Sequence, residues 1–271
     1  MATEWPTGTD VVRVARYDRV AVITLDRPDR RNALHPEMRE PIMRALDEFA
    51  ARDDVGCVVL TGAGTTFCAG GDVKGDVAER SMPDADARVA ALLADAQLAR
   101  VLHEHPKLTV AAVNGPAVGA GLALALACDF RIAAESARLV TGWARLAFSG
   151  DFGGAWFLTR LVGPSRALEL LVSNASLDAR DAHALGLVNR VVPDDGFADA
   201  WMAWAQELAS GPTEAFAGMK ANVHDAAHLS LAEALPRETG RMVASGRSEH
   251  HREAVRAWRE RRPPRYHPPA D

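Results

Sequence analysis

The sequence predicts an α/β fold followed by a helical C-terminal region. Short β-branched runs alternate with helical stretches up to about residue 195, which is typical of an α/β domain. The unit of strand, glycine-rich turn and helix occurs at least twice. From Phe197 onward nearly every segment has helical spacing. We therefore expect residues 1–195 to form the α/β core with the site, and residues 196–271 to form a helical region that serves oligomerisation.

The first expected elements are two strands joined by a short turn. Residues 11–16 and 20–25 are rich in β-branched side chains and flank Tyr17-Asp18-Arg19, so they predict a hairpin. A helix should begin at Pro36, because proline suits the first helical turn. The core should continue with strand 57–61, helix 84–104, strand 109–113, helix 122–128 and strand 129–133.

The second half of the sequence, from about residue 155, predicts mainly helices. Residues 155–162, 165–173 and 179–185 have helical patterns, and Asp178 with Asp181 resembles an N-cap pair for the third. The C-terminal region should then consist of helices 197–210, 213–225, 229–245 and 249–261, followed by a proline-rich tail.

Composition limits the class of partner. The chain has 271 residues, of which 48% are hydrophobic and 25% charged, and 31 basic against 36 acidic residues give a net charge of −5. This mild acidity argues against nucleic acid as the main partner.

Residues 110–128 carry no charge, but Asn114, Pro116 and three glycines favour a buried strand, turn and helix over a membrane span. Three cysteines without metal-ligand spacing and an N-terminus without a signal pattern predict a cytoplasmic protein.

Two glycine-rich turns are the first candidates for chemistry. Residues 67–72 and 114–121 each follow a strand, and the second opens a helix. Such turns expose backbone N–H groups, and two turns facing one point would make an oxyanion hole. Glycine at a strand-to-helix turn is also commonly a steric requirement, so the sequence leaves both readings open. Neither turn matches a nucleotide-binding pattern.

Asp151 is the third candidate. It lies between glycines and near Phe148, Phe152 and Trp156. Burial among these rings would raise the pKa of its carboxyl and prepare it for proton transfer near neutral pH. The alternative is an N-cap for the helix that starts near Gly154, and the sequence favours neither.

Taken in order, these segments resemble the crotonase superfamily, the enoyl-CoA hydratase/isomerase family. The resemblance rests on residues 23–28 with 32–34, 58–62, 67–74, 112–115 with 119–121, 128–133, 158–163, 184–192 and 253–258. It implies a spiral of β-β-α repeats, a homotrimer or dimer of trimers, and an acyl-CoA thioester as substrate. No cofactor is implied beyond the coenzyme A of the substrate.

The resemblance also assigns site residues. The thioester oxygen would accept hydrogen bonds from the N–H groups of Gly71 and Ala120. The binding of coenzyme A and the acyl group would involve Arg30, Arg31, Ala69, Gly70, Asp72, Val73, Pro116, Gly119 and Trp143.

Departures from the family pattern bear on the reaction. Family hydratases carry two glutamates, and those positions correspond here to Ala123 and Trp143. Asp151 falls where some family isomerases keep a catalytic aspartate, so we expect enoyl-CoA double-bond isomerisation with Asp151 as acid and base. The alternatives are an enoyl-CoA hydratase of β-oxidation, an aroyl-CoA dehalogenase-like enzyme, and a non-catalytic acyl-CoA binder. The dehalogenase reading rests on a tryptophan eight residues before the aspartate and needs a histidine base, for which His103 and His105 are candidates.

Overall fold

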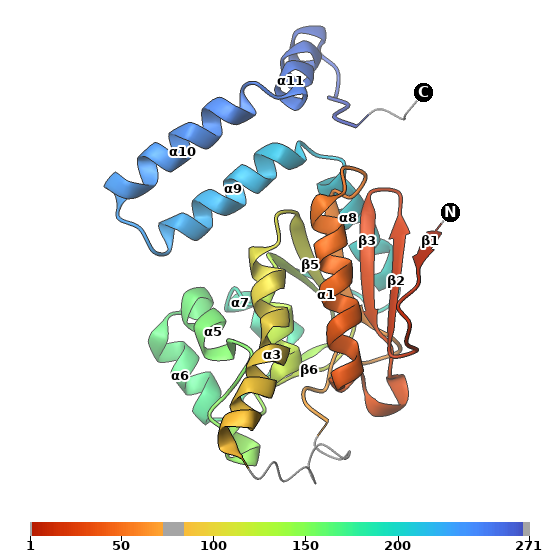
Figure 1. The fold of residues 1–271 in the computed structure, drawn as a ribbon, viewed down its shortest axis with the longest axis vertical. Coiled ribbons are helices and arrows are strands. Elements are labelled where there is room, and N and C mark those ends of the chain that lie inside the picture. The colour runs from red at the N-terminus through yellow and green to blue at the C-terminus, as the bar shows by residue number, and fades with distance from the viewer. Residues whose placement is uncertain (1, 73–83, 268–271) are drawn as a thin grey trace.

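The computed structural model describes residues 2–72 and 84–267. Its main feature is a seven-stranded sheet in the order β1-β2-β3-β4-β5-β7-β10, antiparallel from β1 to β3 and parallel from β3 onward. The strands are β1 (Ala2–Trp5), β2 (Val12–Tyr17), β3 (Val20–Leu25), β4 (Cys57–Gly62), β5 (Leu108–Val113), β7 (Phe130–Ala134) and β10 (Arg190–Val192). The predicted α/β class is confirmed, and Figure 1 shows the sheet behind its helices.

A second, three-stranded sheet was not predicted. It pairs β6 (Ala117–Val118), β8 (Arg138–Val140) and β9 (Ser176–Asp178), which are two or three residues long. Strands this short have no detectable alternation, because their stability comes from their partners and not from their own pattern. The sheet is nevertheless important for the site, since β6 lies inside the second glycine-rich turn.

Helices cover both faces of the main sheet. On one face, residues of α1 (Pro36–Ala51), α3 (Ala85–Glu104) and α4 (Ala120–Ala127) share a buried core with Ile23, Leu25 and Leu60. On the other face, α8 (Phe197–Ala209) packs Trp204 and Ala205 on a second apolar cluster. A side chain on Gly56 would reach to 2.4 Å from the carbonyl oxygen of Ala209, so this contact requires glycine.

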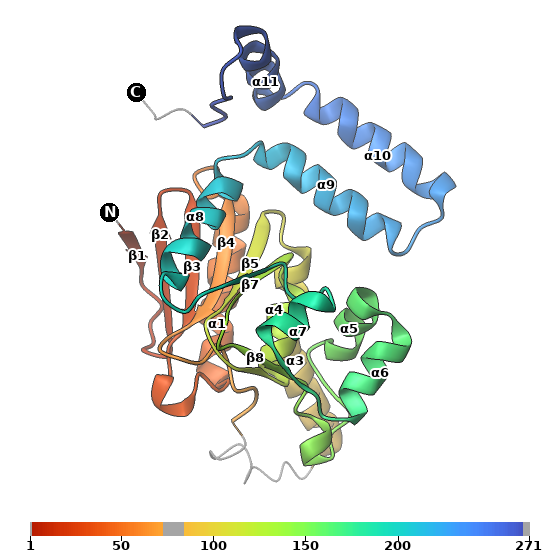
Figure 2. The same ribbon diagram turned by 180° about the vertical axis from the view of Figure 1, so that it is seen from behind.

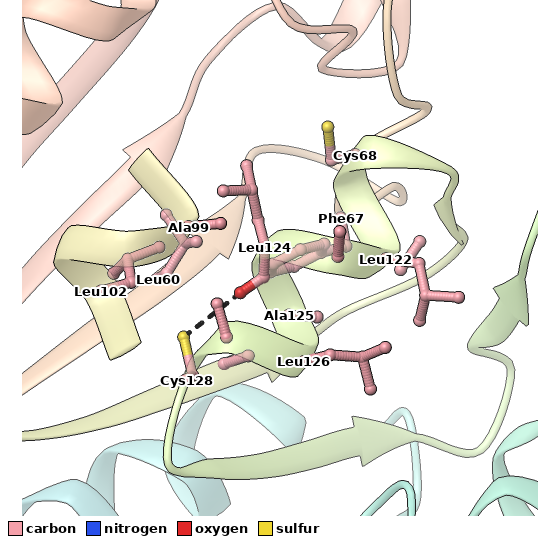
Figure 3. Close-up of a cluster of buried hydrophobic side chains, with 14 of the residues drawn as sticks. Leu60, Phe67, Cys68, Ala99, Leu102, Leu122, Leu124, Ala125, Leu126 and Cys128 are labelled. Carbon is pink, nitrogen blue, oxygen red and sulfur yellow. Dashed lines mark hydrogen bonds between the residues drawn. The ribbon is translucent and has the colours of Figure 1, made fainter. Parts of the chain in front are cut away.

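Helix α4 lies at the centre of the core. All eight of its residues are buried, and Leu122 and Leu124 belong to the same buried cluster as Phe67 and Leu102 (Figure 3). The uncharged stretch 110–128 is therefore a buried strand, turn and helix, as predicted. Within the part of the chain that the structure describes, no helix is both long enough and apolar enough to cross a membrane.

The remaining helices follow in the predicted order. Asp178 caps α7, because its Oδ1 accepts a hydrogen bond from the Asp181 N–H at 2.8 Å, as the N-cap prediction required. Beyond α8 the helices leave the sheet, and α9 and α10 run side by side (Figures 1 and 2). These elements are α5 (Gly154–Val162), α6 (Pro164–Val172), α7 (Ala179–Ala184), α9 (Thr213–Ala226), α10 (Leu231–Ser245) and α11 (Glu249–Glu260). A role of the helical region in oligomerisation stays a prediction.

Candidate active site

Backbone hydrogen bonds hold the two glycine-rich turns together. The N–H groups of Phe67 and Cys68 both donate to the carbonyl oxygen of Pro116, at 3.2 and 3.1 Å. In return, the Val118 N–H donates to the carbonyl oxygen of Cys68 at 2.9 Å. Pro116 therefore connects the two turns through its backbone. The two segments expected to face one point do lie side by side.

Glycine is required where the turns come closest. Gly70 has a φ of +86°, and a Cβ there would lie 2.7 Å from the carbonyl oxygen of Val118 and 3.7 Å from the nitrogen of Ala120. Gly119 has φ +54° and ψ −121°, a conformation that other residues rarely adopt. Gly119 thus directs the chain into α4 so that Ala120 is its first residue.

The two expected oxyanion donors are unoccupied by protein acceptors. Among the described residues, no hydrogen bond uses the N–H of Gly71 or that of Ala120. The Ala120 N–H belongs to the first turn of α4, where the helix dipole favours negative charge. Stabilisation of an oxyanion by these two N–H groups stays a prediction.

Trp143 connects Asp151 to the second turn. The Trp143 indole is only 7% exposed, and its Nε1 donates to Oδ1 of Asp151 at 2.8 Å. The ring packs between two glycines: a Cβ on Gly119 would lie 3.8 Å from Nε1, and one on Gly154 would lie 2.3 Å from Cη2. The Asp151 carboxylate is thereby held near Gly119, the residue that precedes the Ala120 donor.

The N-cap interpretation of Asp151 is wrong. Gly153 occupies the N-cap of α5, and no side chain caps this helix. Asp151 contributes only its backbone, because its carbonyl oxygen accepts from the Gly154 N–H at 2.9 Å. The side chain is free to bond Trp143 because the chain turns sharply around it, with positive φ at Gly150, Phe152 and Gly153. A positive φ at a phenylalanine is strained, and such strain clusters at functional sites.

Burial changes the acidity of Asp151. Desolvation raises the pKa of its carboxyl above the ordinary value, and the hydrogen bond from Trp143 opposes this by stabilising the charged form. The carboxylate is therefore a better proton acceptor than that of an exposed aspartate.

The expected coenzyme A residues lie beside the first turn. Arg30 and Arg31 are exposed, and the carbonyl oxygen of Arg31 accepts from the Ala69 N–H at 3.0 Å. The Asp72 carboxylate instead contacts Arg27, whose Nη2 lies 3.2 Å from Oδ2. Val73 lies outside the described residues. Binding of coenzyme A by this group stays a prediction.

One structural residue was missed. Asn32 is fully buried, and its Oδ1 accepts from the Arg27 N–H at 2.9 Å. Its Nδ2 donates to the carbonyl oxygens of Ala63 at 2.9 Å and Thr66 at 2.6 Å, which joins three segments around the first turn. The sequence feature that could have indicated a buried role for Asn32 is its position directly before the apolar pair Ala33-Leu34.

Neither candidate histidine lies at Asp151. His105 is 3% exposed, and its Nε2 lies 3.0 Å from the carbonyl oxygen of Leu46. His103 stacks on His224, with ring centroids 4.2 Å apart. In the described ranges, the structure brings together Trp143 and Asp151 but supplies no histidine base beside them. The first glutamate position of family hydratases holds Ala123, which is completely buried.

Comparisons with known proteins identify the family and the fold. The model of the enoyl-CoA hydratase/isomerase family matches residues 15–269. The chain belongs to this family. It is an acyl-CoA enzyme of the crotonase superfamily, as the sequence resemblance implied. A crystal structure of an enoyl-CoA hydratase from Polaromonas sp. JS666 superposes with a TM-score of 0.90 at 30% identity, covering 94% of this chain and 99% of that one, which confirms the fold class.

Relatives within the enoyl-CoA hydratase/isomerase family carry several reaction names. A probable enoyl-CoA hydratase of Rhodobacter capsulatus is 37% identical, covering 94% of this chain and 97% of that protein. A 1,2-epoxyphenylacetyl-CoA isomerase of Escherichia coli is 35% identical, covering 91% and 94%. A 4-chlorobenzoyl coenzyme A dehalogenase-2 of Arthrobacter sp. is 32% identical, covering 92% and 91%. Overall similarity therefore leaves the reaction to be argued from the site.

Proposed function

We propose that this enzyme isomerises the double bond of an enoyl-CoA, with Asp151 as the single acid and base. The observation that carries the proposal is the hydrogen bond from Trp143 Nε1 to Asp151 Oδ1, at 2.8 Å, beside the turn that presents Ala120. Isomerisation needs one carboxylate, because the proton taken from one carbon is returned to another. Hydration by two carboxylates needs a second acidic group, and Ala123 and Trp143 occupy the corresponding positions.

The proposed reaction has two proton transfers. The thioester oxygen accepts hydrogen bonds from the N–H groups of Gly71 and Ala120. Asp151 removes a proton from the carbon next to the thioester carbonyl, and the electron pair moves into a dienolate whose negative oxygen the two N–H groups stabilise. Asp151 then returns the proton to the far carbon of the former double bond. The product is an isomer of the substrate, so atoms and electrons balance.

The two carboxylate oxygens have different tasks in this proposal. Oδ1 accepts the hydrogen bond from Trp143, which fixes the orientation of the group. Oδ2 accepts no hydrogen bond from the described residues, so we assign proton transfer to it. The raised pKa favours reprotonation of the dienolate, because the protonated carboxyl is easier to form and then acts as the acid.

Two related proteins suggest the alternatives that the test must separate. The Escherichia coli isomerase supports a ring-derived acyl-CoA as the substrate class. The Rhodobacter capsulatus hydratase supports addition of water, which would need a group other than the two usual glutamates. A dehalogenase-like reaction would use Asp151 as a nucleophile.

The test compares the enzyme with Asp151→Asn on a 2-enoyl-CoA and a 3-enoyl-CoA. Hydration and double-bond migration are followed separately. Migration should fall by about 10²–10⁴-fold in the variant, while binding of the ester is unchanged. Asp47→Asn, at an exposed position on α1, is the matched control and should keep full activity.

Other results would contradict the proposal. Full migration in Asp151→Asn would mean that another group moves the proton. Hydration that persists in both proteins, without migration, would indicate a hydratase that positions water differently. Tight ester binding without any turnover would favour a non-catalytic binder.

A further inference from the structure

A second cavity opens at the other end of α4. It has a volume of about 620 Å³, and its walls include Leu126 and Cys128 from the end of α4, Phe157 of α5 and Val223 of α9. Helix α4 has eight residues and begins at Ala120, so its far end lies roughly 10 Å from the Ala120 N–H along the helix axis. The cavity is therefore distinct from the candidate active site.

Cationic and imidazole groups converge on this apolar cavity. His103 of α3 stacks on His224 of α9 with ring centroids 4.2 Å apart, and it meets the Trp156 ring edge-on at 5.1 Å. The guanidinium carbon of Arg160 lies 3.5 Å from the centre of the Trp156 ring. His228, Lys220, Asp129 and Arg131 also line the cavity. Trp156 thus connects the group, because it contacts the Arg160 guanidinium and the rings of His103 and His228.

These polar groups have unused hydrogen-bonding capacity. Over residues 2–72 and 84–267, no carboxylate pairs with Arg160, and no hydrogen bond uses a ring nitrogen of His103, His224 or His228. Lys220 also lines the cavity, but its Nζ lies 2.8 Å from Oδ2 of Asp129, and this buried pair is neutral overall. Arg131 lines the cavity too, but its guanidinium donates to backbone carbonyl oxygens, among them those of Leu187 and Cys128. Arg160 is therefore the lining cation whose donors have no protein acceptor among the described residues.

We propose that this cavity binds an apolar monocarboxylate. The carboxylate would accept hydrogen bonds from Arg160 and from the imidazoles of His103 and His224, and the hydrocarbon part would lie against Leu126, Phe157 and Val223. The volume falls within the range of small-molecule sites, which are mostly apolar with a few converging polar groups. Arginine is well suited to a carboxylate because its planar fork of donors matches the two oxygens. This inference does not rest on the proposed isomerisation.

Proton uptake should accompany binding. Burial, and then the neighbouring His224, lower the pKa of His103 to about 4, and burial also lowers the pKa of His224. Lys220 disfavours protonation of both rings, with Arg160 acting on His103 and His228 on His224. Asp129 favours protonation of both, and Glu104 favours that of His224. A bound carboxylate adds negative charge and therefore raises both pKa values. Binding should become tighter as the pH falls from about 7 toward the pKa of the bound imidazoles.

The experiment titrates octanoate into the full-length protein by calorimetry at about pH 6, in two buffers of different ionisation enthalpy. We expect one octanoate per chain and net proton uptake. Arg160→Met should weaken binding by about tenfold or more, which corresponds to about 1.4 kcal/mol. Arg166→Met, on α6 and paired with Glu169 at 2.8 Å, is the matched control and should bind normally. Val223→Trp fills the cavity from an exposed position and should abolish binding without loss of the fold.

Four results would overturn the proposal. One is absence of binding up to about 5 mM octanoate, the weak end of specific affinity. Another is equal binding of octanol, which lacks the carboxylate. A third is displacement of octanoate by an acyl-CoA in simple competition, which would put it in the active site. The fourth is a self-associated protein that Val223→Trp dissociates, because a second copy of the chain would then cover the cavity.

Discussion

The two ends of helix α4 are built on different principles. At the Ala120 end, two glycine-rich turns lie close together and present the backbone N–H groups of the proposed site, and Trp143 holds the Asp151 carboxylate nearby. At the Cys128 end, long side chains of α3, α5 and α9 surround an open cavity. The first end depends on backbone geometry, and the second depends on which side chains meet.

This difference predicts how each end responds to substitution. A backbone site tolerates changes of side chain but is damaged by a Cβ where glycine is required. A site made of side chains loses its properties one group at a time. The following experiments test that contrast, from the largest expected effect to the smallest.

Gly119→Ala should have the largest effect on turnover. Alanine disfavours φ +54° with ψ −121°, so the turn must shift and move the Ala120 N–H away from the oxyanion. We expect kcat to fall by about 10²–10³-fold, as for loss of one oxyanion donor. Octanoate binding at the far end of α4 should be unchanged. An equal loss at both ends would show that the variant has disturbed α4 as a whole.

Lys220→Met should have the largest effect on stability. Lys220 and Asp129 are both largely buried and 2.8 Å apart, so the substitution leaves Asp129 without its cation, although Thr109 still donates two hydrogen bonds to it. The free energy of unfolding should fall by about 3 kcal/mol in urea denaturation. Lys107→Met is the control, since no ion pair to Lys107 exists in the described residues. If adding Asp129→Asn fails to restore stability, the loss is not electrostatic.

Trp143→Phe should change the pH dependence of the reaction. The indole N–H stabilises the charged form of Asp151, so its removal raises the pKa of a carboxyl that burial has already raised. The acid limb of the kcat/KM profile should therefore move to higher pH, with about a tenfold loss of rate at neutral pH. A loss of rate with an unmoved acid limb would mean that Trp143 acts only by filling space between Gly119 and Gly154.

His103→Phe should make the protein less sensitive to acid. Burial lowers the pKa of His103 to about 4, so the unfolded chain binds a proton more readily than the folded one. Stability is therefore present above the unfolded pKa of about 6.5 and is lost as the pH falls toward the folded pKa. Because the ring is only half-buried, solvent screening reduces this contribution to about 1 kcal/mol between pH 7 and pH 5. Phenylalanine keeps the ring contacts, and urea unfolding at both pH values measures the difference.

The long elements were predictable because their signal is local. The α8 helix and the β2-β3 hairpin follow from side-chain spacing, and each glycine-rich turn was recognisable because it follows a strand. The short strands β1, β6, β8, β9 and β10 were not predicted, because two to four residues hold no period. These strands are stabilised by hydrogen bonds to strands that are distant in the sequence.

By itself, the sequence determined the α/β class, the family and the identity of the chemically capable residues, because side-chain spacing and residue type are local properties. Only the tertiary structure decided what Asp151 does with its carboxylate. Trp143 reaches it only because Gly119 and Gly154 leave room for the indole. The meeting of His103 with His224, 121 positions apart in the chain, was likewise invisible in the sequence. Contacts of this kind depend on the packing of whole elements, which no local pattern records.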